Sequence, residues 1–236
     1  MTECPLQDRD LTEARWALLR PLVSPTVAIA AQDPLAAPPA PFAAEAACLS
    51  PNAVEKRKRE FAAGRAAAHQ SMRALGKPPA PIPIGPKRAP LWPDGLVGSI
   101  THCSNCALAA VAARATHQGL GIDVEEDAPL SRDLWPAIAS PDEQAWMATQ
   151  PDPGLAGKVL FSAKEAAYKA QYALSQRYFG FDGLTLSFDW ANTGFVACFS
   201  RAQPPFLAGQ RLRGRFAIGS GVIITAVEIL NNESCP

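Results

Sequence analysis

The clearest pattern in the chain is a short stretch in which apolar and charged residues alternate. Residues 120–125 read Leu-Gly-Ile-Asp-Val-Glu. Alternation with a period of two is typical of a half-buried strand, whose successive side chains point to opposite faces. Asp123 and Glu125 are therefore expected to project from the same face, roughly 6–7 Å apart along the strand.

The distribution of apolar and polar residues also predicts the remaining elements. Capping residues and apolar spacing predict a helix at residues 11–20 and a second helix that begins at Ser50-Pro51, runs to about Leu75 and ends at Gly76. A third, short helix is expected to begin at Ser140, and a fourth is expected to run from a turn at 151–154 to about Leu174. Alternating or β-branched runs predict strands at residues 27–31, 97–100, 107–113, 184–190, 194–200, 212–218 and 221–230. Proline-rich runs at 33–41 and 77–95 are expected to be loops. Because helix is followed by strands twice along the chain, the sequence indicates an α+β fold.

A second charged pair lies in the predicted helix that ends near Leu174. Its residues 161–169 read Phe-Ser-Ala-Lys-Glu-Ala-Ala-Tyr-Lys, so Glu165 and Lys169 are one turn apart on the same side. Three carboxylates would offer the hard oxygen ligands that suit Mg²⁺, and a lysine beside them suits a phosphorylated substrate. Two plainer readings stay open at this point: Asp123 and Glu125 as the wet face of an edge strand, and Glu165 with Lys169 as a solvated ion pair.

Basic residues gather in the helix predicted to begin at Ser50. Lys56, Arg57, Lys58 and Arg59 are followed by Arg65. On a helix Arg57 and Arg65 differ by only ~80° in azimuth, so both can line one side of a groove. The alternatives are a solvated basic face or a weak RNA contact.

Composition sets the limits of the possible classes. The chain has 236 residues, 48% of them apolar and 19% charged, with a formal net charge of zero. It is long enough for one large domain or two small ones, and nothing favours a disordered chain, a collagen-like repeat or overall nucleic-acid binding. Acidic residues near the start (Glu3, Asp8, Asp10, Glu13) do not suit a secretory signal, and no apolar run approaches the ~20 residues of a membrane span. We therefore expect a cytoplasmic protein without a membrane span.

The six cysteines do not suggest a disulfide framework. They are Cys4, Cys48, Cys103, Cys106, Cys198 and Cys235. Without an export signal, reduced thiols are expected. Cys103 and Cys106 have a spacing known from metal and redox sites, but a second Cys-x-x-Cys pair is absent from the sequence, so a structural zinc is not favoured.

Several motifs in order resemble one family. They are Gly98-Ser99-Ile100-Thr101-His102, the Gly-Ile-Asp-Val-Glu run at 121–125, the 161–169 segment, Arg57–Phe61 with Gly64-Arg65, Pro83-Ile84-Gly85 and Trp92–Gly95. Together they resemble the 4′-phosphopantetheinyl transferases, of the larger, monomeric type that includes the enterobactin-synthase component. The matching stretches cover about residues 55–172.

The resemblance implies a fold and a reaction. The expected fold has two similar α+β halves related by a pseudo-twofold, residues 1–116 and 117–236, with the active site in the cleft between them. The expected reaction moves the 4′-phosphopantetheine arm of coenzyme A to a serine of an acyl or peptidyl carrier protein and releases adenosine 3′,5′-bisphosphate. It depends on Mg²⁺, with Mn²⁺ as an alternative, and belongs to siderophore or other secondary-metabolite biosynthesis. A monomer without a nucleic-acid partner is expected.

The resemblance also implies roles for individual residues. Asp123, Glu125 and Glu165 match the metal ligands, and Glu165 also matches a proton acceptor for the serine. Lys164 and Lys169 match the lysines that meet the pyrophosphate, with Lys169 in the catalytic group and Asp123 beside the coenzyme. The remaining coenzyme A contacts match Arg57, Arg65, Thr101 and His102, while Lys87 and Arg88 would replace a basic residue that some relatives have at Ile84.

Two rival functions follow from subsets of these features. A non-catalytic coenzyme A-binding protein on the same fold would need the basic residues but not all three acidic positions. A nucleic-acid binder would rest on Lys56–Arg59 alone, and neutral net charge without interleaved aromatic residues argues against it. Asp123, Glu125 and Glu165 together favour the enzyme.

Overall fold

The computed structural model of this chain describes residues 5–231, so Glu3, Cys4 and Cys235 lie outside the described residues. Its α-helices are α1 (Pro5–Leu19), α2 (Ala43–Ala46), α3 (Glu55–Ala74), α4 (Trp135–Ile138), α5 (Pro141–Ala148) and α6 (Pro153–Ser175). Its strands are β1 (Ala28–Gln32), β2 (Leu96–Cys103), β3 (Cys106–Ala113), β4 (His117–Glu126), β5 (Leu184–Asp189), β6 (Gly194–Phe199), β7 (Arg211–Gly219) and β8 (Val222–Leu230). Short 3₁₀ turns lie at η1 (Arg20–Leu22), η2 (Pro86–Arg88), η3 (Arg132–Leu134) and η4 (Phe181–Gly183).

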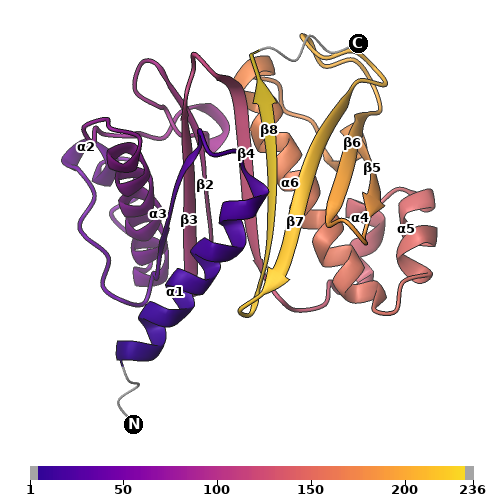
Figure 1. The fold of residues 1–236 in the computed structure, drawn as a ribbon, viewed down its shortest axis with the longest axis horizontal. Helices are drawn as coiled ribbons and strands as arrows, with labels where there is room; N and C mark the ends of the chain where they lie inside the picture. The colour runs from indigo at the N-terminus through magenta and orange to yellow at the C-terminus, as the bar shows by residue number, and fades with distance from the viewer. Residues whose placement is uncertain (1–4, 232–236) are drawn as a thin grey trace.

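The strands form two antiparallel sheets that stand side by side (Figure 1). The first has the order β1-β3-β2, and the second has the order β4-β8-β7-β6-β5. A mixed fold of helices and sheets is therefore confirmed. Because the sheets have three and five strands, they differ in size, and the pseudo-twofold between two similar halves stays a prediction.

The two sheets meet where β2 lies beside β4. There, side-chain hydroxyls replace the usual backbone ladder: Ser99 Oγ accepts from the Ile122 N–H at 3.1 Å, and Thr101 Oγ1 accepts from the Val124 N–H at 3.2 Å. These hydroxyls satisfy buried backbone donors that a missing ladder would leave unpaired. The Gly98–His102 motif thus holds the two sheets together at the strand that carries Asp123.

Helices cover the sheets on two sides. Helix α3 packs on the first sheet through Ala67, Ala68 and Met72, and α6 packs on the second, while α1 and the segment after it cover the opposite face at the junction (Figure 1). Ile122 and Val124 belong to the core on the α1 side. Since side chains alternate along a strand, Asp123 and Glu125 face α6, as the alternating pattern predicts.

Most predicted elements are confirmed, including the Ser140 capping box, the helix end at Gly76 with φ +74° and the strands after residue 184. The predicted start of the basic helix is wrong: α3 begins at Glu55, with Val54 at its N-cap. The Ser50 carbonyl accepts from the Ala53 N–H and its hydroxyl accepts from the Asn52 N–H, so Ser50 closes a separate turn. Among residues 5–231, no helix is long and apolar enough to cross a bilayer.

Candidate active site

The site begins with a close approach between β4 and α6. A Cβ atom added at Gly121 would lie 1.9 Å from the Ala166 carbonyl oxygen and 2.6 Å from the Ala170 nitrogen. Only glycine therefore lets the helix come so near the strand. Glu165 and Lys169 belong to the same turns of α6, so this contact brings them over the face of β4 that carries Asp123 and Glu125.

Asp123 lies at the centre of the site. Its side chain is buried, and its Oδ1 accepts from Lys169 Nζ at 2.7 Å and from Thr101 Oγ1 at 3.0 Å. Its other oxygen, Oδ2, is buried without a hydrogen-bond partner among the residues that the structure describes. A buried carboxylate oxygen without a partner is costly, so this atom is suited to a bound cation or donor.

Glu125 and Glu165 complete the acidic group. Burial raises the pKa of Glu125, the Asp123 carboxylate raises it further, and Lys158, whose Nζ lies 3.2 Å from Glu125 Oε2, opposes the rise. Burial likewise raises the pKa of Glu165, opposed by Lys169 and reinforced by Asp123 and Glu125. The Asp123 carboxylate thus acts on both glutamates, while the role of the three carboxylates as metal ligands stays a prediction.

The acidic side chains have the right chemistry for a divalent cation, but they are not already arranged as a metal site. Within the described part of the chain, no three His, Cys, Asp or Glu side chains are already arranged around one point as metal ligands. Lys169 and Lys158 instead stand beside Asp123 and Glu125. The donor set still fits, because it offers hard oxygens, an unpartnered Asp123 Oδ2, and two glutamates whose raised pKa values a cation would lower.

A basic hollow lies between α3 and β2. Arg57 Nη1 lies 2.9 Å from His102 Nε2, and Glu60 Oε2 lies 3.7 Å from His102 Nδ1. Burial lowers the pKa of His102, an effect that Glu60 opposes and Arg57 reinforces. A Cβ atom added at Gly64 would lie 2.9 Å from the Ile100 side chain, so this glycine keeps α3 close to β2.

Arg65 also lines the basic hollow but is more deeply set. Only 6% of it is exposed, its Nε donates to the Ile82 carbonyl at 2.8 Å, and its guanidinium carbon lies 4.4 Å from the centre of the Phe61 ring. Burial lowers its pKa to about 10, so it remains positively charged at neutral pH. Arg57 and Arg65 therefore line one hollow, as their helical spacing predicts.

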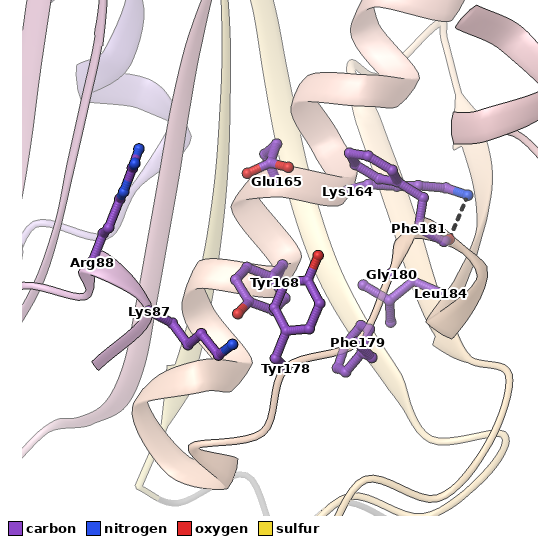
Figure 2. Close-up of a pocket in the computed structure, with 10 residues that line it drawn as sticks. All are labelled: Lys87, Arg88, Lys164, Glu165, Tyr168, Tyr178, Phe179, Gly180, Phe181 and Leu184. Atoms are coloured by element: carbon purple, nitrogen blue, oxygen red, sulfur yellow. Dashed lines mark hydrogen bonds between the residues drawn. The ribbon is translucent and has the colours of Figure 1, made fainter. Parts of the chain in front are cut away.

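Arg88 connects the basic hollow to the acidic group. It lines that hollow, a central hollow with Glu165 and Lys169, and a third, aromatic cavity of about 390 Å³. Lys87 Nζ lies 5.2 Å from the centre of the Tyr178 ring. The aromatic cavity is lined by Tyr168, Tyr178, Phe179, Phe181 and Leu184 among others (Figure 2). Arg88 is common to all three hollows, which include Arg57, Glu165 and Phe181 in their linings and are together called the groove.

Lys164 lines the aromatic cavity together with Lys87, Arg88 and Glu165, but its ammonium group is engaged by other partners. The residue is buried, and Nζ donates to Glu143 Oε2 at 2.8 Å, to the Ile138 carbonyl at 2.9 Å and to the Phe181 carbonyl at 3.1 Å. Figure 2 shows Lys164 and Glu165 leaving α6 in different directions. An ammonium group has three N–H donors, and all three are occupied here, so these contacts do not support the expected role of Lys164 as a pyrophosphate ligand, which stays a prediction.

Three residues of the site were not predicted from the sequence: Lys158, Tyr168 and Tyr178. Lys158 lies about two turns before Glu165 on α6, and its position beside Glu125 follows only from the packing of α6 on β4. Tyr168 and Tyr178 come together across the end of α6, with ring centres 6.0 Å apart. Tyr168 follows Glu165 by three residues, a spacing that places both on one helix side and offers a usable signal.

The sequence matches known families in two adjacent parts. The 4′-phosphopantetheinyl transferase N-terminal domain matches residues 44–112, and the 4′-phosphopantetheinyl transferase superfamily matches residues 119–224. The second range contains Asp123, Glu125 and Glu165, and the first contains Arg57 and Arg65.

Curated relatives agree with these matches. The chain is 37% identical over 205 residues to the 4′-phosphopantetheinyl transferase PptT of Mycobacterium tuberculosis, and the matched stretch covers 83% of this chain and 88% of that protein. It is 38% identical over 199 residues to the 4′-phosphopantetheinyl transferase Svp of Streptomyces mobaraensis, covering 80% and 78%. Over 125 residues it is 42% identical to enterobactin synthase component D of Escherichia coli, covering 50% and 57%.

These similarities extend over most of the chain and include the strand, helix and basic residues that form the groove. Expectations of a transferase, of coenzyme A as substrate and of a carrier protein as partner are thereby confirmed. The chain belongs to the 4′-phosphopantetheinyl transferase family, whose members transfer the phosphopantetheine arm of coenzyme A to carrier proteins.

Proposed function

We propose that the groove from Arg57 to Phe181 is the active site, with Asp123, Glu125 and Glu165 as ligands of Mg²⁺. The observation that carries this proposal is Asp123 Oδ2, a buried carboxylate oxygen with no partner among the described residues, beside a lysine and two further carboxylates. Mg²⁺ prefers such oxygens, and when bound it neutralises charge on the pyrophosphate.

The chain's own residues have separate tasks in this proposal. Arg57, His102 and Arg65 bind the 3′-phosphate of coenzyme A in the basic hollow, because arginine pairs with phosphate bidentately. Arg88 lies on the path from this hollow to Glu165, so its cation is suited to the pyrophosphate. Lys169, at 2.7 Å from Asp123, supplies a second cation beside the leaving phosphate.

Transfer then requires one proton to be moved. The serine Oγ of the carrier protein attacks the β-phosphorus, the bond from that phosphorus to the bridging oxygen breaks, and adenosine 3′,5′-bisphosphate leaves. Glu165 accepts the serine proton. Burial raises its pKa and so makes it a better base than a free carboxylate, whereas a neighbouring cation lowers that pKa. Positioning and charge neutralisation therefore contribute more than proton abstraction, as in phosphoryl transfer generally.

The aromatic cavity is suited to the pantetheine arm. It opens beside Glu165 and is lined by tyrosine and phenylalanine rings, which can pack against the methyl and methylene groups of the extended arm. We further propose that residues 1–116 and 117–236 are the two halves that enclose the groove. The two family matches, 44–112 and 119–224, lie on either side of residues 113–118 and support this division.

Calorimetry of coenzyme A binding tests the metal ligands. Asp123→Asn keeps the size of the side chain and removes its charge, and Asp127→Asn, at an exposed position nearby, is the matched control. We expect Mg²⁺ to tighten binding for the wild type and for Asp127→Asn but not for Asp123→Asn. An Asp123→Asn variant whose binding still responds fully to Mg²⁺ would show that Asp123 is not a ligand.

A further inference from the structure

A buried glutamate lies behind the basic hollow, in a part of the chain that the transfer reaction does not use. Glu45 belongs to the short helix α2 and has no exposed surface. Its Oε1 accepts from His69 Nε2 and from the Ile82 N–H, each at 2.8 Å, and its Oε2 accepts from the Phe42 N–H at 2.8 Å. Arg65 Nε lies 3.9 Å from the same Oε1.

The Ile82 peptide is held from both of its polar atoms. Glu45 accepts from its nitrogen, and Arg65 Nε donates to its oxygen at 2.8 Å. Glu45 and Arg65 are thus fixed relative to each other by one backbone segment as well as by their opposite charges. Rotation of the Arg65 guanidinium away from Ile82 would break this hydrogen bond and move its positive charge away from Glu45.

The same segment forms a wall of the basic hollow. Ile84, two residues after Ile82, lines that hollow together with Arg88, and its N–H donates to Cys48 Sγ at 3.4 Å, just after α2. The segment that contains α2 is therefore joined to this wall at two points, through Cys48 and through Glu45. Glu45 is the only charged group of α2 and the point where α2, α3 and this wall are joined.

His69 and Phe42 fix the glutamate from the other side. The His69 and Phe42 rings pack with centres 4.7 Å apart, so the donor at His69 Nε2 has little freedom. Burial would raise the pKa of Glu45, but the hydrogen bonds from His69, Ile82 and Phe42 together hold it below its ordinary value. The carboxylate is therefore charged when it faces Arg65.

We propose that Glu45 is a positioning residue for 3′-phosphate recognition: it holds Arg65 and the Ile82–Ile84 wall in the geometry that binds the phosphate of coenzyme A. This inference rests on the proposed assignment of the basic hollow to the 3′-phosphate. Glu45 itself does not touch the coenzyme, because no part of it is exposed to the hollow.

The test compares coenzyme A with dephospho-coenzyme A as substrates. Glu45→Gln keeps size but replaces one acceptor oxygen with an NH₂ group. We expect KM for coenzyme A to rise about 10-fold, the lower end of the range known for residues that orient metal ligands, which act on a bound group in the same indirect way. The kcat should stay within about twofold, and KM for dephospho-coenzyme A should change by less than about twofold, because that substrate makes no use of the hollow.

Glu228→Gln is the matched control. Glu228 is a carboxylate of β8 that accepts from His117 Nε2 at 3.0 Å and from the Ser24 N–H at 2.5 Å, so it resembles Glu45 chemically but lies outside the groove. We expect this variant to treat both substrates as the wild type does. If Glu45→Gln yields too little folded protein, His69→Phe removes one donor and preserves a ring beside Phe42, with an expected rise of about threefold in KM for coenzyme A.

The outcomes separate this inference from the assignment of the hollow. If Arg57→Ala weakens coenzyme A but not dephospho-coenzyme A, while Glu45→Gln and His69→Phe affect both substrates equally, Glu45 is merely structural and the inference is wrong. If Arg57→Ala itself affects both substrates equally, the assignment of the hollow is wrong and the inference falls with it.

Discussion

The family motif assigns Lys164 to phosphate binding, whereas its contacts in the structure favour a role in stability. Its ammonium group is enclosed by Glu143 Oε2 and the carbonyls of Ile138 and Phe181. Burial lowers the pKa of Lys164, and Glu143 opposes this effect. We predict that Lys164→Met leaves the affinity for adenosine 3′,5′-bisphosphate within about twofold of wild type but lowers the free energy of unfolding.

The size of that loss follows from what remains unpaired. Removing one partner of a buried ion pair costs about 3–5 kcal/mol, because the other charge stays buried. Glu143 keeps two donors in the Ser140 and Leu186 N–H groups, so the lower figure of about 3 kcal/mol applies. For a chain of this size, that loss lowers Tm by roughly 6–12 °C.

A double-mutant cycle with Glu143→Gln separates the two roles. Urea unfolding should give a coupling energy of about 1–3 kcal/mol between the two positions, the usual range for residues in contact. Calorimetry with adenosine 3′,5′-bisphosphate should give similar affinities for wild type and all three variants. A 10-fold weaker affinity for Lys164→Met, with no such change for Glu143→Gln, would refute this reasoning and restore Lys164 as a phosphate ligand.

Two further predictions concern packing and pH. Gly121→Ala should slow transfer at least ~10²-fold, because the added Cβ would displace α6 and with it Glu165. In Gly194→Ala, the added Cβ would lie 3.9 Å from its nearest neighbour, so this control should transfer at the wild-type rate when the modified carrier protein is followed by mass spectrometry. The pKa of Glu45 is lower in the folded than in the unfolded protein. Its ionised form therefore stabilises the fold when the pH is above the ordinary pKa of 4.5, and this stabilisation is lost as the pH falls through the lowered pKa. Urea unfolding between pH 3 and 7 should therefore depend less on pH in Glu45→Gln, and equal slopes for both proteins would contradict this.

The sequence predicts those parts of the site that depend on periodicity within one element. Alternation along β4 places Asp123 and Glu125 on one face, and a four-residue interval on α6 places Glu165 near Lys169. The same geometry already separates Lys164 from Glu165, because adjacent helical residues point about 100° apart. The family motif at residues 161–169 contains both Lys164 and Lys169 and does not distinguish their directions.

Features that depend on distant segments could not be predicted in this way. Glu45 meets His69 and Ile82, which are 24 and 37 residues away, and no local pattern in 33–54 indicates a buried carboxylate. The start of α3 differs from the predicted one for a related reason: Ser50-Pro51 is a good local helix signal, but the hydrogen bonds of Ser50 close a turn instead. Local propensity was overridden there by the path of the chain into α3.

The most direct test of the account is the rate of transfer by a variant at Glu165. Wild type, Glu165→Gln and the exposed control Glu126→Gln are incubated with an apo-carrier protein, coenzyme A and Mg²⁺, and the modified carrier is followed by mass spectrometry. We predict that Glu165→Gln binds coenzyme A but transfers at least ~10²-fold more slowly, the usual scale for loss of a general base, and that Glu126→Gln matches the wild type. A near-wild-type rate for Glu165→Gln would contradict the central claim, because the charge and basicity of Glu165 would then not be needed for transfer.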